Sequence, residues 1–225
     1  MDRRLIAVTT AALLSLTACG EGTPAPEEVA AAGSLECAPP PALPSGVTTY
    51  SQQDLPDPVS VEPATVRATI ATNCGDLVLE LDAAQAPQTV ASFLFLGEEG
   101  YWDDSPCHRL TTAGIFVLQC GDPTGDGRGS PGYGYGIENA PVDGHFPPGT
   151  LAMARTNDPF SNGGQFFIVY EDTQLPTDGG GYSIFGKVTS GMEIVEGIAA
   201  AGVDGGRQDG SPAQPISILS VTVKE

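Results

Sequence analysis

The chain has 225 residues, which suits one ordinary domain with extensions or two small domains. It carries 9 Lys and Arg residues against 28 Asp and Glu residues, for a formal net charge of -19. This balance argues strongly against a nucleic-acid-binding protein, because a phosphate backbone requires basic patches, and it gives little attraction to anionic lipid surfaces.

Residues 1–18 predict a secretory signal peptide. A basic MDRR stretch precedes the apolar run LIAVTTAALLSLTA, which is shorter than the ~20 residues of a membrane-spanning helix. The run ends in LTAC, followed by Gly20, and this pattern resembles a bacterial lipobox, in which Cys19 becomes the lipid-modified first residue after cleavage. We therefore expect a lipid-anchored protein on the extracytoplasmic face of the cell membrane. The alternative is an ordinary secretory signal with a coincidental cysteine.

Residues 19–64 predict a linker anchored by lipid at Cys19. They are rich in Pro, Ala, Glu, Ser and Gly and contain few large apolar side chains. Such a composition buries too little surface to offset the entropy lost on ordering, so we expect a semi-extended spacer. Cys37, inside this segment, would tie it to the domain that follows.

The third segment, residues 65–225, predicts a globular domain that begins with a hairpin and a helix. Two alternating apolar runs surround NCGD and indicate a β-hairpin over residues 66–82. The stretch APQTVASFLFLGEEG indicates a helix, with Pro87 in its first turn and Gly97 or Gly100 at its end.

The rest of this domain predicts short strands and a second helix. CHRL, GIFVLQCGD, TLAMAR, QFFIVY and YSIFGKV are all short and strand-like. SGMEIVEGIAAAG predicts a helix that begins with a capping box of Ser190 and Glu193, and PISILSVTVKE predicts a closing strand. Short strands at irregular spacing with two helices favour a mainly β fold, either an antiparallel barrel or a sandwich.

Four cysteines remain once Cys19 is assigned to lipid. In an oxidising compartment an even number of cysteines favours disulfides, and four allow three pairings. A zinc site is poorly supported, because the sequence has no Cys-x-x-Cys and neither histidine repeats at ligand spacing. We expect no metal and no cofactor.

Two familiar kinds of active site are also poorly supported. GRGSPG, residues 127–132, matches G-x-G-x-x-G, but Pro131 and further Gly-Tyr residues follow, so no helix opens as a dinucleotide loop requires. Only His108 and His145 offer an imidazole base, and no G-x-S-x-G nucleophile motif is present.

What remains is one Arg in CHRL, a Gln in IFVLQCGD, another in GGQFFIVY, and apolar neighbours. Within SNGGQFFIVY, alternation along a strand places Gln165 and Phe167 on one face, where a ligand could lie, and Phe166 and Ile168 on the other. The alternative is that both faces are core and the turn is only a turn. A cation, amides and an apolar pocket suit a reaction without bond cleavage, such as rotation about an X–Pro bond, whose barrier is ~18–20 kcal/mol.

These motifs resemble one known family. HRL…GIFVLQCGDPTGDGRGSPGYGY, GTLAMAR, SNGGQFFIVY and YSIFGKVTSGMEIVEGIA resemble the cyclophilins, which are peptidyl-prolyl cis–trans isomerases. The likeness runs from about Thr65 to Glu225, with the motifs in family order. It implies a closed eight-stranded antiparallel β-barrel capped by two α-helices, in agreement with the elements above.

The resemblance also implies roles for individual residues. Arg109 matches the catalytic arginine, which donates a hydrogen bond at the prolyl nitrogen. The matching substrate-binding positions are Phe116, Val117, Gln119, Ala154, Arg155, Gln165, Phe167, Leu175 and Tyr182. Phe116, Val117, Phe167 and Leu175 would form the proline pocket. Gln119 and Gln165 would bind substrate backbone or orient Arg109, and Ala154 and Arg155 would lie along the extended peptide. Cys107 and Cys120 would pair across a hairpin, with Cys37 joining Cys74.

The chain departs from the family pattern in four ways. Two extra residues lie around Thr111 and Thr112, and one lies between Met153 and Gln165. The third departure is Arg155, which stands where the family usually has Asn. The fourth is in the pocket, where Tyr182 replaces the usual His and the Trp that contacts ligands is missing. Because cyclosporin contacts that Trp, we expect weak cyclosporin binding. Arg109 is retained, so we expect catalysis to survive.

These observations predict a monomeric isomerase that assists the folding of extracytoplasmic proteins by acting on Pro-containing polypeptides. Membrane attachment would come from the lipid, and we expect no nucleic-acid partner. A non-catalytic module that holds Pro-containing segments in the same groove is one alternative, and a structural lipoprotein domain is another.

Overall fold

The computed structural model describes residues 35–58 and 64–224. The predicted signal peptide, the lipobox at Cys19 and the first part of the linker lie outside these residues. None of the helices that are described has both the length and the apolar character needed to cross a membrane.

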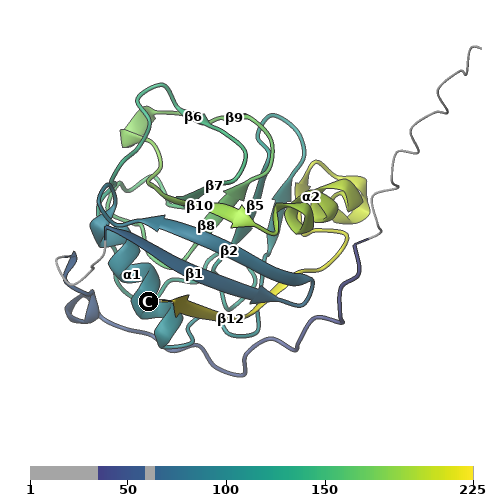
Figure 1. Ribbon diagram of the computed structural model, residues 1–225, viewed down its shortest axis with the longest axis horizontal. Helices are drawn as coiled ribbons and strands as arrows, with labels where there is room; N and C mark the ends of the chain where they lie inside the picture. Colours follow the sequence, from purple (N-terminus) through teal and green to yellow (C-terminus); the bar gives the residue numbers. More distant parts are fainter. Residues whose placement is uncertain (1–34, 59–63, 225) are drawn as a thin grey trace, which may run out of the picture. The chain divides into compact units, whose positions relative to one another are not determined.

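An antiparallel ten-stranded sheet forms the body of the domain, in the order β11-β4-β5-β8-β7-β10-β2-β1-β12-β3 (Figure 1). Its strands are β1 (Thr65–Thr72), β2 (Gly75–Asp82), β3 (Ser105–Pro106), β4 (Arg109–Thr111), β5 (Val117–Cys120), β7 (Thr150–Met153), β8 (Phe166–Val169), β10 (Ile184–Ser190), β11 (Asp209–Gly210) and β12 (Ser217–Lys224). A two-stranded sheet pairs β6 (His145–Phe146) with β9 (Thr173–Gln174). The fold is therefore mainly β, as predicted.

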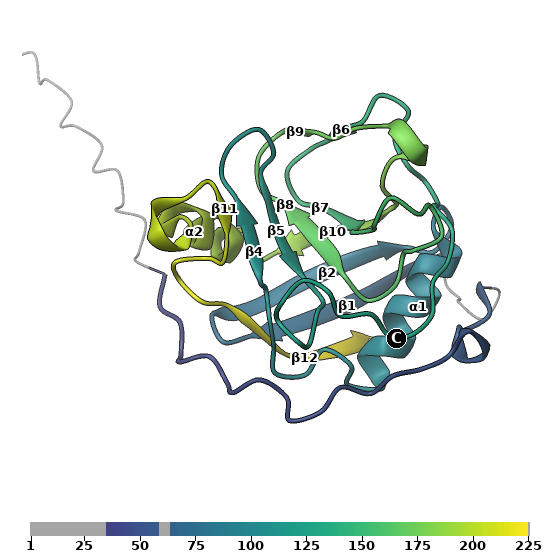
Figure 2. The ribbon, with the colours of Figure 1, turned by 180° about the vertical axis from the view of Figure 1, so that it is seen from behind.

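In the part of the chain that the structure describes, two α-helices accompany the sheet, α1 (Pro87–Glu98) and α2 (Met192–Ala201). Figures 1 and 2 show them at opposite ends of the curled sheet, with α2 beside β11 and β4. The short 3₁₀ helices are η1 (Gln52–Asp54), η3 (Asp178–Gly180) and η4 (Asp204–Gly206). Helix α1 begins at Pro87, whose missing N–H is unneeded in a first turn, and it buries Val90, Phe93 and Leu96.

The predicted hairpin is present as β1 and β2, which pair from Thr65 with Asp82 to Thr72 with Gly75. The alternating apolar residues of both strands face the core, because strand side chains alternate between faces. The turn depends on Gly75, which has a φ of 123°, and on the Thr72 hydroxyl, which donates to the Gly75 carbonyl at 2.6 Å.

The closed eight-stranded barrel was a wrong prediction. The sheet has ten strands and curls, but its strand order has two ends, β11 and β3. The stretch that would close a barrel is split into two strands, because Cys107 and His108 lie between β3 and β4 and belong to neither. β3 pairs with β12, whereas β4 begins at Arg109 and pairs with β5.

The predicted capping box of α2 was also wrong. Ser190 is the last residue of β10, and the residue before the helix is Gly191, with a φ of 94°. No side-chain hydrogen bond caps this end. The N-cap position therefore falls one residue after Ser190, on Gly191, whose left-handed backbone favours glycine and where a Cβ would clash with the Asp76 carbonyl oxygen.

Residues 35–58 contain no strand or α-helix, but they are held against the domain. In Figures 1 and 2 this dark blue segment passes β12 and reaches α1. The Tyr50 N–H donates to the Pro131 carbonyl at 2.7 Å, and the Tyr50 ring packs edge-on against Phe95 at 5.1 Å between centroids. The Gln52 side chain both donates to and accepts from the backbone of Gly134.

Both disulfides implied by the resemblance are present. Cys37 bonds to Cys74, 37 residues away, and Cys107 bonds to Cys120, 13 residues away. The first attaches the segment before the domain to the β1–β2 turn. The second crosses the β4–β5 hairpin beside Arg109, as the resemblance implied.

We expect the double substitution Cys37→Ala and Cys74→Ala to lower the free energy of unfolding by about 2–4 kcal/mol, because the bond closes a long loop and restricts the unfolded chain. Urea unfolding followed by the fluorescence of Trp102, the single tryptophan, measures this change. Repeating the comparison with both proteins fully reduced is the control, and the difference should then vanish. Equal stability of the two oxidised proteins would contradict the expectation.

Candidate functional site

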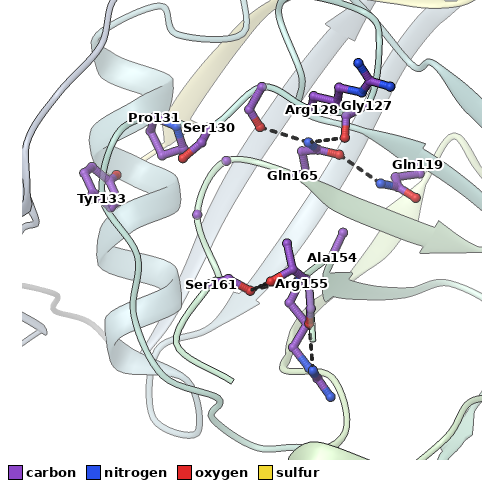
Figure 3. Close-up of a pocket in the computed structure, with 14 residues that line it drawn as sticks. Gln119, Gly127, Arg128, Ser130, Pro131, Tyr133, Ala154, Arg155, Ser161 and Gln165 are labelled. Carbon is purple, nitrogen blue, oxygen red and sulfur yellow. Dashed lines mark hydrogen bonds between the residues drawn. The ribbon is translucent and has the colours of Figure 1, made fainter. Parts of the chain in front are cut away.

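Two adjoining cavities lie against strands β4, β5 and β8, on one face of the sheet. The smaller has a volume of about 200 Å³ and is lined by Arg109, Ile115, Val117, Gln119, Ala154, Arg155, Phe167, Leu175 and Tyr182. The larger has a volume of about 490 Å³ and is shown in Figure 3. Gln119, Ala154 and Arg155 line both, so the two cavities form one continuous site.

Apolar side chains form one side of the smaller cavity. Strand alternation turns Val117 and Gln119 of β5 to the same side, and Phe167 of β8 pairs directly with Gln119. Phe167 packs against Phe146 at 6.2 Å and edge-on against Tyr182 at 6.0 Å between ring centroids. These contacts belong to a small buried cluster, separate from the main core, that also contains Leu175.

Arg109 is one of two arginines that line the smaller cavity, the other being Arg155. Its Nε and Nη2 donate to the two carboxylate oxygens of Asp209, at 2.8 and 2.7 Å, and its Nη1 donates to Gln119 Oε1 at 3.2 Å. The hydrogen bonds to Asp209 raise the pKa of Arg109 above its ordinary value, and those from Arg109 lower the pKa of the Asp209 carboxyl. The guanidinium is therefore charged at any physiological pH.

A chain of amides connects Arg109 to the wall of the larger cavity. Gln119 Nε2 donates to Gln165 Oε1 at 2.9 Å, and Gln165 Nε2 donates to the carbonyls of Gly127 and Gly129 at 3.1 and 2.9 Å (Figure 3). Each amide thus has its acceptor turned toward a donor and its donor toward a carbonyl, which orients both side chains. Gln165 lines the larger cavity and Phe167 lines the smaller, so both face the adjoining cavities, where a ligand was expected.

Arg155 closes one side of the smaller cavity. Its guanidinium lies 4.9 Å from the centre of the Tyr182 ring, within the range of a cation–π contact. Its three nitrogens donate to the carbonyls of Gly181, Thr156 and Asp178. The N–H of the neighbouring Ala154 donates to the Gln165 carbonyl at 3.0 Å.

The structure places one of the predicted pocket residues, Phe116, apart from the others. Phe116 lines neither cavity, because alternation along the chain turns it away from the side that carries Ile115 and Val117. Its ring packs edge-on against Tyr170 at 6.0 Å, on a separate hollow beside α2. Ile115 takes its place in the smaller cavity. All the other predicted site residues, from Arg109 to Tyr182, line one or both cavities.

Sequence reasoning also missed Asp209. It lies 100 residues after Arg109, in a loop-rich segment with no motif of its own. Only the pairing of β11 with β4 brings it to the arginine.

The cavities hold no imidazole. Neither is lined by a histidine, and burial lowers the pKa of His108, which sits next to Arg109 in the chain. Within the described ranges, 35–58 and 64–224, no group of three or more His, Cys, Asp or Glu side chains is placed to hold a metal ion. The arrangement offers held cations, oriented amides and a cavity with one apolar side.

The family described as cyclophilin type peptidyl-prolyl cis-trans isomerase/CLD matches residues 67–223. This chain is a member of the cyclophilin family. A probable peptidyl-prolyl cis-trans isomerase B of Mycobacterium leprae is 42% identical over 177 residues, which cover 72% of this cyclophilin and 58% of the relative. The chain thus spans little more than half the length of that relative.

Shorter relatives and solved structures match over most of their own length. The peptidyl-prolyl cis-trans isomerase cyp18 of Streptomyces antibioticus is 36% identical over 166 residues, covering 68% of this chain and 95% of the relative. A crystal structure of a Cryptosporidium parvum cyclophilin type isomerase matches with a TM-score of 0.61 and 32% identity, covering 72% of this chain and 98% of its own. Another, determined in the presence of the dipeptide Ala-Pro, has a TM-score of 0.60, 33% identity and coverage of 71% and 99%. The cyclophilin-like fold with two helices agrees with these likenesses.

Proposed function

We propose that this chain is a peptidyl-prolyl cis–trans isomerase that accelerates rotation about X–Pro bonds in extracytoplasmic polypeptides. The observation that carries the proposal is the position of Arg109. Its charged guanidinium lines a cavity of about 200 Å³ that also has an apolar side, to which Val117, Phe167 and Leu175 contribute. The names of the relatives support the same activity.

The proposed chemistry needs no proton transfer. The proline ring enters the smaller cavity, between Phe167, Val117 and Leu175, while the peptide bond before it lies at Arg109. Amide resonance sets a barrier of ~18–20 kcal/mol to rotation. A hydrogen bond from Arg109 to the prolyl nitrogen favours its pyramidal form, which has lost that resonance, and therefore stabilises the twisted transition state more than either ground state.

The strength of this bond sets what the arginine can contribute. A hydrogen bond to a charged group is worth ~1.5–3 kcal/mol, which is about one to two decades of rate. The remaining acceleration comes from the pocket, which removes water and holds the ring while the chain before it turns.

The rest of the peptide lies along the segment at Ala154 and Arg155. The Ala154 N–H is already bound to Gln165, so the peptide backbone pairs here with the Ala154 carbonyl or the Arg155 N–H. Residues before the proline then reach the larger cavity, whose wall is held by Gln165.

We expect Arg109→Ala to lower kcat/KM by about 100-fold, since it removes a charged donor from the transition state. The cis-to-trans rate of a short X–Pro peptide measures this. Arg109→Lys keeps the charge without the planar fork and should restore only part of the rate. Arg67→Ala is the matched control, because Arg67 is an exposed arginine on β1 that lines neither cavity.

The outcomes separate isomerase from binding module. A fast wild-type protein that is slowed by Arg109→Ala and not by Arg67→Ala supports catalysis. A well-folded wild-type protein with no acceleration would overturn it. Binding of the same peptides by that inactive protein would instead favour a module that only holds Pro-containing segments.

We also expect cyclosporin to bind weakly. The chain's single tryptophan, Trp102, is buried and donates its Nε1–H to the Gly164 carbonyl at 3.0 Å, so it cannot substitute for the missing ligand-contacting Trp. Gln174→Trp, at the nearest position in sequence, should tighten binding. Calorimetric titration of the wild-type protein and this variant tests the expectation, and nanomolar affinity of the wild type would contradict it.

A lipid-anchored, extracytoplasmic location is part of the same proposal. The lipobox-like LTAC sequence supports it, and two disulfides fit an oxidising compartment. Palmitate labelling of the wild-type protein that is lost in Cys19→Ala would be the expected result. A secreted wild-type protein without lipid would point instead to an ordinary signal peptide.

A further inference from the structure

The carboxylate of Asp209 accepts two hydrogen bonds from one edge of the Arg109 guanidinium. Its two oxygens accept from Nε at 2.8 Å and from Nη2 at 2.7 Å, which is the bidentate geometry that suits an arginine best. Asp209 itself lines neither cavity, so it can affect the site only through its contact with Arg109.

Asp209 is brought to this place by the backbone. It lies on β11, where Asp209 pairs with Thr111 and Gly210 with Leu110 of β4. The Thr112 N–H also donates to the Gln208 carbonyl at 2.9 Å. The carboxylate and the guanidinium therefore start from neighbouring strands and meet at a fixed distance.

The pair contributes little to stability. The two side chains are 38% and 55% exposed, and solvent screens ion pairs with such exposure. A strand of two residues likewise adds little to the sheet. The contact instead orients the guanidinium. A free arginine side chain samples many rotamers, and two parallel hydrogen bonds to one carboxylate restrict it to few of them.

The remaining donors of Arg109 show what the orientation achieves. A guanidinium has five N–H groups. Two donate to Asp209 and one, on Nη1, donates to Gln119. One N–H on Nη1 and one on Nη2 remain, and these two are the donors left for an acceptor in the cavity.

We propose that Asp209 is the positioning residue of this site: with Gln119, it fixes the rotation of the Arg109 guanidinium so that the free N–H groups of Nη1 and Nη2 face the prolyl bond. This rests on the proposed isomerase function. The charged groups that face Asp209 are Arg109 from β4 and Arg207 from its own loop, and both favour the ionised carboxylate.

The test compares Asp209→Asn with wild type on a short X–Pro peptide. The amide keeps the size of the side chain but turns an N–H toward Arg109, so the fork is lost. Because small misplacements of a reacting group cost up to about 100-fold in rate, we expect kcat to fall about 10- to 100-fold with little change in KM. Asp209→Glu, which restores a carboxylate, should recover part of the rate.

Two controls separate positioning from charge and from folding. Asp204→Asn removes one exposed negative charge from the same loop and should leave the rate unchanged. In an Arg109→Ala background, Asp209→Asn should have no further effect, because its action runs through the arginine. Equal losses in both backgrounds, or an unchanged kcat in the single variant, would overturn the proposal.

A measurement independent of activity completes the test. The ¹⁵Nε–H resonance of Arg109 should be slow to exchange with solvent in the wild type and fast in Asp209→Asn. If the wild type lacks isomerase activity but shows this difference, the isomerase proposal fails while the ion pair holds. If exchange is equally fast in both proteins, Asp209 does not position Arg109.

Discussion

The register of three strands, β4, β5 and β8, is the constraint on which the candidate site depends. Arg109 pairs with Gln119, and Gln119 pairs with Phe167, so a cation, an amide and an aromatic ring stand in one row across the sheet. A slip of one residue would turn each of them to the opposite face. The Cys107–Cys120 disulfide crosses the same hairpin, directly beside the row.

The polar side chains around this row are held by hydrogen bonds that restrict their rotamers. Gln119 lies between Arg109 and Gln165, and Gln165 is held in turn by two carbonyls of the glycine-rich segment. A catalytic group that must stabilise a fleeting twisted bond gains from such preorganisation, because no rearrangement is then needed during the reaction. The same hydrogen bonds shape the wall of the larger cavity, so this wall and the side chain that contacts the cation belong to one hydrogen-bond network.

The segment before the domain supports the site from outside. It is tied at one end by the Cys37–Cys74 disulfide, and Tyr50 and Gln52 bond to the backbone near Pro131 and Gly134. Pro131 and Tyr133, in the same stretch, line the larger cavity. Residues that precede the family match at 67–223 thus brace a wall of the site.

Local patterns in the sequence determined the hairpin, both α-helices, most strands, and the facing of Gln165 and Phe167, because alternation and helix spacing are properties of neighbouring residues. The motifs also pointed to Arg109 and to most of the cavity lining. Only the tertiary structure decided that β3 and β4 are separate strands and that the sheet order has two ends. It also decided that Ile115 rather than Phe116 lines the smaller cavity, and that Asp209 holds Arg109. These outcomes depend on pairing between strands whose residues are up to 100 positions apart. A local sequence pattern does not show which distant strand will pair with a given one.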